Sequence, residues 1–147
     1  MNIKSAIAIA VLASAFAAPP LAQAADSSYK PGTVWEFSYI KTEPGQFENY
    51  MDWLSQQWKQ QNEFGKKEGY LVSYHIFNVN NAREGEPDLI LAIEYKDYMP
   101  NAERMAVQKK FEAMLSSDSH KMETASGERK VMRKLAGSME LQELNLK

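Results

Sequence analysis

The sequence predicts an α+β fold in which one four-stranded antiparallel sheet carries two helices on one face. β-branched and aromatic stretches alternate with amphipathic stretches in the order strand, helix, strand, strand, helix, strand. The 147 residues include 44% hydrophobic and 24% charged side chains, the composition of an ordinary globular domain. A separate apolar segment at the start of the chain stands outside this pattern.

Residues 1–24 are expected to be a cleavable signal peptide. Lys4 precedes an uncharged, mostly apolar run over 6–18, prolines follow at 19 and 20, and Ala22–Ala24 fits a small-residue cleavage site. The apolar run is shorter than the roughly 20 residues that span a bilayer, which makes a membrane anchor the weaker alternative. We therefore expect cleavage after this motif and a periplasmic or secreted protein.

The mature chain is expected to be one domain over 34–147, after a flexible lead-in over 25–33 that contains a Pro-Gly pair. Residues 34–41 read as a strand because aromatic and β-branched side chains dominate them. A Pro-Gly turn follows, and 46–68 reads as a helix that ends at Gly69. Its apolar stripe consists of Phe47, Tyr50, Met51, Leu54 and Trp58.

The second half of the domain repeats the pattern. Residues 70–79 and 88–98 are expected to form a hairpin around the polar loop 80–87. A second helix is expected over 102–116, with Asn101 as its N-cap and Val107, Phe111, Met114 and Leu115 on one side. Residues 117–133 are polar, with room for a short helix over 128–133, and the last strand is expected over 134–146.

This βαββαβ order is the ferredoxin-like arrangement. Alternation along the strands divides the side chains into two faces. The face expected under the helices carries Trp35, Phe37, Tyr39, Tyr70, Val72, Tyr74, Ile76, Leu89, Leu91, Ile93, Tyr95, Leu135, Met139 and Leu141. The other face is expected to carry Val34, Glu36, Ser38, Ile40, Leu71, Ser73, His75, Phe77, Val79, Ile90, Ala92, Glu94, Ala136, Ser138, Glu140, Gln142, Leu144 and Leu146. It is too apolar for a solvent face, which predicts that a second copy of the chain covers it in a homodimer.

These features resemble the dimeric α/β-barrel superfamily. The resemblance rests on the element order, on a strand that ends in the run Lys41–Gly45 before an amphipathic helix, and on the half-apolar open sheet. That superfamily includes small cofactorless monooxygenases of the antibiotic-biosynthesis type. The resemblance implies a homodimer joined through the open sheet face, no cofactor, and an aromatic or lipophilic ligand between sheet and helices. No catalytic signature of the superfamily is present, so no catalytic residue is carried over.

His75, Glu36 and Glu94 form the candidate catalytic group, with Glu140 nearby. In this fold the first and third strands are the central neighbours, which places Glu36 beside Glu94, and His75 lies next to Glu94 across the hairpin. A carboxylate beside a histidine can orient it as a general acid or base. The alternatives are a divalent-metal site and a hydrogen-bonded interface without catalysis, and we assign no metal.

A second candidate site is a pocket for a small, partly aromatic molecule between the sheet and the helices. Its expected lining is Trp35, Tyr39, Trp53, Trp58, Tyr74 and Tyr95. The alternative is that these rings form plain core. His120, the other histidine, is expected to be solvated.

Several function classes are excluded or disfavoured. The chain has 0 Cys, which removes thiolate catalysis and Cys-ligated metals, and its net charge of −2 argues against a nucleic-acid partner. No P-loop, GxGxxG, GxSxG or HExxH motif occurs. We expect small-molecule binding as the function. The alternatives are a cofactorless oxygenase, isomerase or lyase that uses His75, and a structural or partner-binding dimer.

Overall fold

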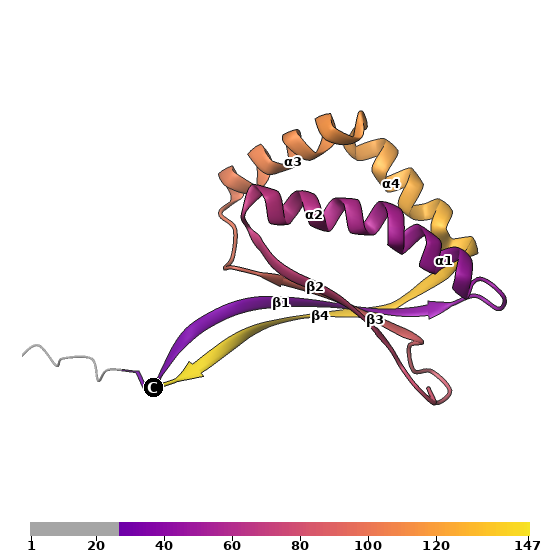
Figure 1. Ribbon diagram of the computed structural model, residues 1–147, viewed down its shortest axis with the longest axis horizontal. Helices are drawn as coiled ribbons and strands as arrows, with labels where there is room; N and C mark the ends of the chain where they lie inside the picture. The colour runs from indigo at the N-terminus through magenta and orange to yellow at the C-terminus, as the bar shows by residue number, and fades with distance from the viewer. Residues whose placement is uncertain (1–26) are drawn as a thin grey trace, which may run out of the picture.

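The computed structural model describes residues 27–147 (Figure 1). The predicted signal peptide lies outside the described residues. The strands are β1 (Tyr29–Thr42), β2 (Leu71–Asn78), β3 (Leu89–Tyr95) and β4 (Arg133–Leu146). The helices are α1 (Phe47–Trp53), the π-helix η1 (Leu54–Trp58), α2 (Lys59–Glu68), α3 (Asn101–Leu115), α4 (Ser119–Glu128) and the 3-10 helix η2 (Arg129–Val131).

The four strands form one antiparallel sheet in the order β2-β3-β1-β4, so β1 and β3 are the central neighbours as predicted. Figure 1 shows every helix on one side of this sheet and the opposite side bare. The α+β, ferredoxin-like prediction is therefore confirmed. β1 begins earlier than predicted, because Tyr29 pairs with Leu146 at the end of β4 and draws part of the expected lead-in into the sheet.

The long first helix is confirmed as a continuous helical run through α1, η1 and α2. It ends at Gly69, whose φ of 87° is the left-handed conformation that glycine adopts without strain. The core forms where this run meets the sheet, and its buried members are Ile40, Tyr50, Leu54, Trp58, Leu89 and Leu91.

The region 117–133 holds a helix that the sequence did not predict. α4 spans Ser119–Glu128, and the carboxylate of Asp118 caps its start by accepting a hydrogen bond from the Lys121 backbone at 2.9 Å. The helix was not predicted because its residues are mostly polar and none of them is buried, so no apolar stripe marks it. The N-cap prediction for Asn101 is wrong, since Asn101 is already inside α3 and Pro100 precedes it.

The prediction of which side chains face the helices is wrong for β1. Side chains directly opposite each other on paired strands share a face. Glu36 pairs with Ile93 and Ser38 with Leu91, so Val34, Glu36, Ser38 and Ile40 share the helix-covered face with Leu89, Leu91, Ile93 and Tyr95. It follows that Trp35, Phe37 and Tyr39 lie on the bare face.

The same reversal holds for β4 beyond Gly137, whereas Leu135 pairs with Ile40 and lies on the helix-covered face as predicted, because the register shifts between Tyr39 and Ile40. Met139 pairs with Phe37 and Leu141 with Trp35, which places both on the bare face, where they are 46% and 47% exposed. On β2, Tyr74 and Ile76 lie under the helices as predicted, because they pair with Ile93 and Leu91. A register shift between Leu71 and Ser73 then buries Leu71 and leaves Val72 exposed, against prediction.

Asp88 ties the hairpin loop to the end of β1. Its carboxylate accepts hydrogen bonds from Lys41 Nζ at 2.7 Å and from the backbone and hydroxyl of Thr42, each at 2.8 Å. Burial raises the pKa of Asp88, but these hydrogen bonds outweigh burial and hold the pKa below its ordinary value.

Candidate functional site

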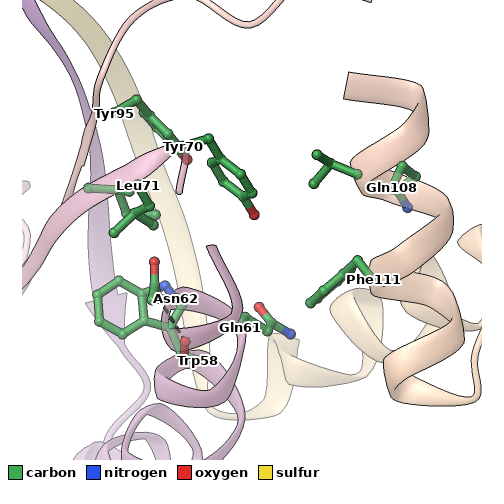
Figure 2. A pocket seen from close by; sticks show the side chains of 10 residues that line it. Trp58, Gln61, Asn62, Tyr70, Leu71, Tyr95, Gln108 and Phe111 are labelled. Atoms are coloured by element: carbon green, nitrogen blue, oxygen red, sulfur yellow. Dashed lines mark hydrogen bonds between the residues drawn. The ribbon is translucent and has the colours of Figure 1, made fainter. Parts of the chain in front are cut away.

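Two adjoining cavities lie between the sheet and α3, and α2 borders the first of them. The first, here called the apolar cavity, has a volume of about 240 Å³ and is drawn in Figure 2. Its lining is Trp58, Gln61, Asn62, Tyr70, Leu71, Ile93, Tyr95, Val107, Gln108 and Phe111. The second, the acidic cavity, has a volume of about 340 Å³ and shares Tyr70, Tyr95, Val107 and Gln108 with the first. Its remaining lining is Val34, Glu36, Asp97, Tyr98, Met99, Arg104 and Glu140.

The cavities exist because α3 does not pack closely against the sheet. None of its residues is buried, although Val107 and Phe111 are half-buried. Two contacts attach it to α2. The rings of Phe64 and Phe111 lie 5.5 Å apart, and Lys110 Nζ lies 2.6 Å from Glu68 Oε2. The helix is thus held at its edge, and the space beneath it stays open.

The apolar cavity combines aromatic walls with one buried amide. Trp58 contacts Tyr74 edge-on at 5.3 Å between ring centroids. Asn62 is 4% exposed, and its amide nitrogen donates a hydrogen bond to the carbonyl oxygen of Trp58 at 2.7 Å. Figure 2 shows Asn62 at the cavity wall between Trp58 and Leu71, with Phe111 facing them from α3. The lining thus combines rings with the amides of Gln61, Asn62 and Gln108, and rings with convergent polar groups are typical of small-molecule sites.

Tyr95 stands where the two cavities meet. Its hydroxyl donates a hydrogen bond to Glu36 Oε2 at 3.2 Å, and its ring stacks on Tyr70 with a centroid distance of 6.4 Å. Burial raises the pKa of Tyr95, and the negative charge of Glu36 raises it further. Tyr95 therefore remains a protonated donor to Glu36.

The structure separates the predicted catalytic group. His75 and Glu94 lie together on the bare face, joined through Ser73: the hydroxyl of Ser73 donates to Glu94 Oε2 at 2.6 Å and lies 3.3 Å from His75 Nε2. Glu36 and Glu140 lie on the helix-covered face, where they pair with each other across β1 and β4. The prediction that all four share a face is wrong, because the register of β1 and β4 is the reverse of the one assumed.

The predicted aromatic lining is also divided between the two faces. Trp35 and Tyr39 lie on the bare face, so they cannot line a pocket under the helices. Trp53 and Tyr74 are on the helix side but outside both cavities: Trp53 stacks on Tyr50 at 5.8 Å and lies under the guanidinium of Arg129 at 4.3 Å. Only Trp58 and Tyr95 of the predicted set line the apolar cavity.

Sequence reasoning missed Asn62, Tyr70, Gln108 and Phe111 as cavity residues. A signal was present for two of them. Asn62 follows Trp58 by four positions and so continues the apolar stripe of the first helix as a polar side chain. Phe111 belongs to the apolar side of the second predicted helix, together with Val107, which also lines the cavity.

Beside Ser73 and Glu94 the bare face carries a mostly aromatic and apolar patch, here called the aromatic open face. His75 stacks between Trp35 and Phe77, with centroid distances of 6.2 and 5.9 Å. Ala92, beneath these rings, is fully buried, whereas Phe77 is 49% exposed. The surface comprises Trp35, Phe37, Tyr39, His75, Phe77, Ile90, Ala92, Met139 and Leu141.

Within residues 27–147, no group of three or more histidine, aspartate or glutamate side chains is placed to hold a metal ion. His120 is exposed on α4. None of the helices in the described part of the chain is long and apolar enough to cross a membrane.

Comparison with known proteins leaves the family open. No family model and no curated protein matches the sequence. Among solved structures, the crystal structure of HapK from Hahella chejuensis superimposes with a TM-score of 0.49 and 7% identity, over 75% of this chain and 91% of HapK.

Proposed function

We propose that this protein binds a small, partly aromatic molecule in the apolar cavity. The observation that carries the proposal is the unfilled space under α3, which has aromatic walls and a buried amide. The space is a half-open groove at the edge of the core, and a concave surface with aromatic walls and convergent polar groups is where small ligands usually bind. The acidic cavity alone, at about 340 Å³, lies within the range of typical ligand sites, about 300–1,000 Å³, and the adjoining apolar cavity adds to it.

Filling the cavity tests this proposal. Val107 lines both cavities from α3, and Val107→Trp should occupy the space without removing any buried core side chain. Binding of 2-phenylethanol, a neutral aromatic probe, is followed by saturation-transfer NMR. We expect binding to wild type and its loss in Val107→Trp. Met105→Trp is the matched control, since Met105 lies on the same helix, is 64% exposed and lines neither cavity. Equal binding by all three proteins, or by none, contradicts the proposal.

We also propose that the protein is exported and works as a homodimer joined through the aromatic open face. The predicted signal peptide supports export. The partly exposed Phe77, Met139 and Leu141 support the dimer, since a monomer rarely leaves such a surface in water. Intact-mass measurement of material from the periplasm or the medium should give a mature chain that begins at Ala25. A full-length chain recovered from the cytoplasm alone contradicts export.

The chain from His75 through Ser73 to Glu94 favours a second candidate function, a cofactorless enzyme of the oxygenase, isomerase or lyase type. Ser73 donates to the carboxylate and can accept from an imidazole N–H, so the chain can fix the orientation of the His75 ring. Any turnover by this group should be lost in His75→Ala and retained in Tyr95→Phe. The reverse pattern would place the chemistry at the cavities.

A further inference from the structure

We infer that Arg129 and Arg133 form a binding site for a phosphate group at the end of the sheet where β4 begins. Arg129 lies where α4 passes into η2, and Arg133 is the first residue of β4. Figure 1 shows this part of the chain beside α1. Neither arginine lines the apolar or the acidic cavity, so the inference goes beyond the proposed function.

The two arginines have buried donors that no protein atom satisfies. Among the side chains of residues 27–147 that are not exposed, two buried polar atoms lack a hydrogen-bond partner, and these are the Nε atoms of Arg129 and Arg133. Buried donors are nearly always paired in folded proteins, because an unpaired donor keeps its full cost of desolvation. Since both exceptions fall on cationic side chains, the missing partner is an anion.

The positive charges of the two side chains are close together and have no counterion. Within the described part of the chain, neither Arg129 nor Arg133 forms an ion pair. Burial lowers the pKa of Arg129, the charge of Arg133 lowers it further, and no carboxylate opposes them. Burial raises the pKa of the Tyr50 hydroxyl, and the charges of both arginines oppose that rise, which places the three groups together. A bound anion would remove the repulsion between the guanidinium groups.

The surroundings fix the guanidinium of Arg129 and leave part of each arginine open. Its central carbon lies 4.3 Å from the ring centroid of Trp53, which in turn stacks on Tyr50, and its Nη1 donates to the carbonyl oxygen of Ala125 at 3.1 Å. Apart from this bond and the contact of Arg133 with Tyr50, the described residues offer neither guanidinium an acceptor. The other terminal nitrogens are not buried, so a ligand can reach them from solvent.

The charge of the arginine pair selects the class of anion. A phosphate group carries a charge of about −1.5 to −2 at pH 7, so one phosphate neutralises two guanidinium ions, whereas a carboxylate neutralises one. The planar N–H fork of arginine also matches the oxygens of a phosphate. The terminal N–H groups make the first contacts, and rotation of each guanidinium then turns its Nε–H toward the same oxygens. The ligand is therefore inorganic phosphate or a small phosphate monoester.

Titration with inorganic phosphate, with glycerol 3-phosphate and with acetate at constant ionic strength tests the inference. The readout is the pair of Nε–H signals of Arg129 and Arg133 in proton–nitrogen NMR spectra at pH 7. We expect both signals to shift and saturate with phosphate, with an affinity about tenfold or more above that for acetate, because charge-assisted bonds to two guanidinium groups are the strong ones. The tighter of the two phosphates identifies the free ion or the ester as the ligand. Shifts that do not saturate, or equal affinities for phosphate and acetate, overturn the inference.

Removal of one arginine locates the site. Arg133→Gln should weaken phosphate binding about tenfold or more. The matched control is Lys134→Gln, which removes the same charge from the exposed neighbouring residue and should leave the affinity unchanged. Should Arg133→Gln fail to fold by circular dichroism, Arg133→Lys keeps the charge, and loss of the planar fork should still weaken binding several-fold. Full affinity in Arg133→Lys, or an equal loss in Lys134→Gln and Arg133→Gln, would mean that overall charge attracts the phosphate, which overturns the inference.

Discussion

Replacing Phe77 with serine tests whether the aromatic open face joins two copies of the chain. Phe77 is 49% exposed in the single chain. Full burial of a phenylalanine side chain stabilises by about 1.5–3 kcal/mol, so burial of the exposed half contributes about 1 kcal/mol. A twofold-symmetric interface contains this side chain twice, and the substitution should therefore cost about 2 kcal/mol per dimer, or roughly a thirtyfold rise in the dissociation constant.

Sedimentation equilibrium over a wide range of protein concentration measures this constant. The control is Met105→Ser, which removes an apolar side chain that is 64% exposed on α3, away from the sheet. We expect the dimer to weaken in Phe77→Ser and to be unchanged in Met105→Ser. The reasoning is refuted if wild type is monomeric at every concentration, or if both substitutions shift the constant equally.

Three further predictions concern stability and motion. Asp88→Asn should lower the free energy of unfolding by about 1–2 kcal/mol at pH 7. The pKa of Asp88 is lower in the folded than in the unfolded protein. The extra stability of wild type over the variant is therefore fully present above the unfolded-state pKa, and it should shrink as the pH falls through the folded-state pKa. Urea denaturation at several pH values measures this difference. Gly69→Ala should destabilise the fold by about 1 kcal/mol because φ at this position is 87°. Gly127→Ala should instead stabilise it, since Gly127 lies inside α4 with open space around it. Thermal unfolding in which both substitutions shift the melting temperature in the same direction would contradict this account. Lys110→Ala removes the ion pair that joins α3 to Glu68 of α2. Amide hydrogen exchange should become faster in α3 and stay unchanged in β1. An equal change in both elements would show that this ion pair does not hold α3 independently of the sheet.

The sequence by itself determined the order and type of most elements. Gly69 ends the first helix because only a residue free of Cβ strain continues easily into the left-handed turn, and this is a local property. Trp58 and Tyr95, two of the six aromatic residues predicted to line a pocket, do border the apolar cavity. The sequence did not predict α4 because none of its side chains is buried, so it shows no periodic apolar stripe. Its start is fixed instead by the cap from Asp118.

Only the tertiary structure decided which face of the sheet the helices cover. Alternation along β1 places Trp35 and Phe37 on one face of the sheet and Glu36 on the opposite face. Because both faces of β1 are partly apolar, alternation alone does not decide which of them the helices cover. Hydrogen bonding with β3 makes that choice, since it places Glu36 opposite Ile93 and beneath the helices. The same choice separates Glu36 from His75, brings it to Tyr95 in the cavity wall, and leaves the aromatic rings on the open face. Register is a relation between strands distant in the chain, which is why no single stretch of sequence contains it.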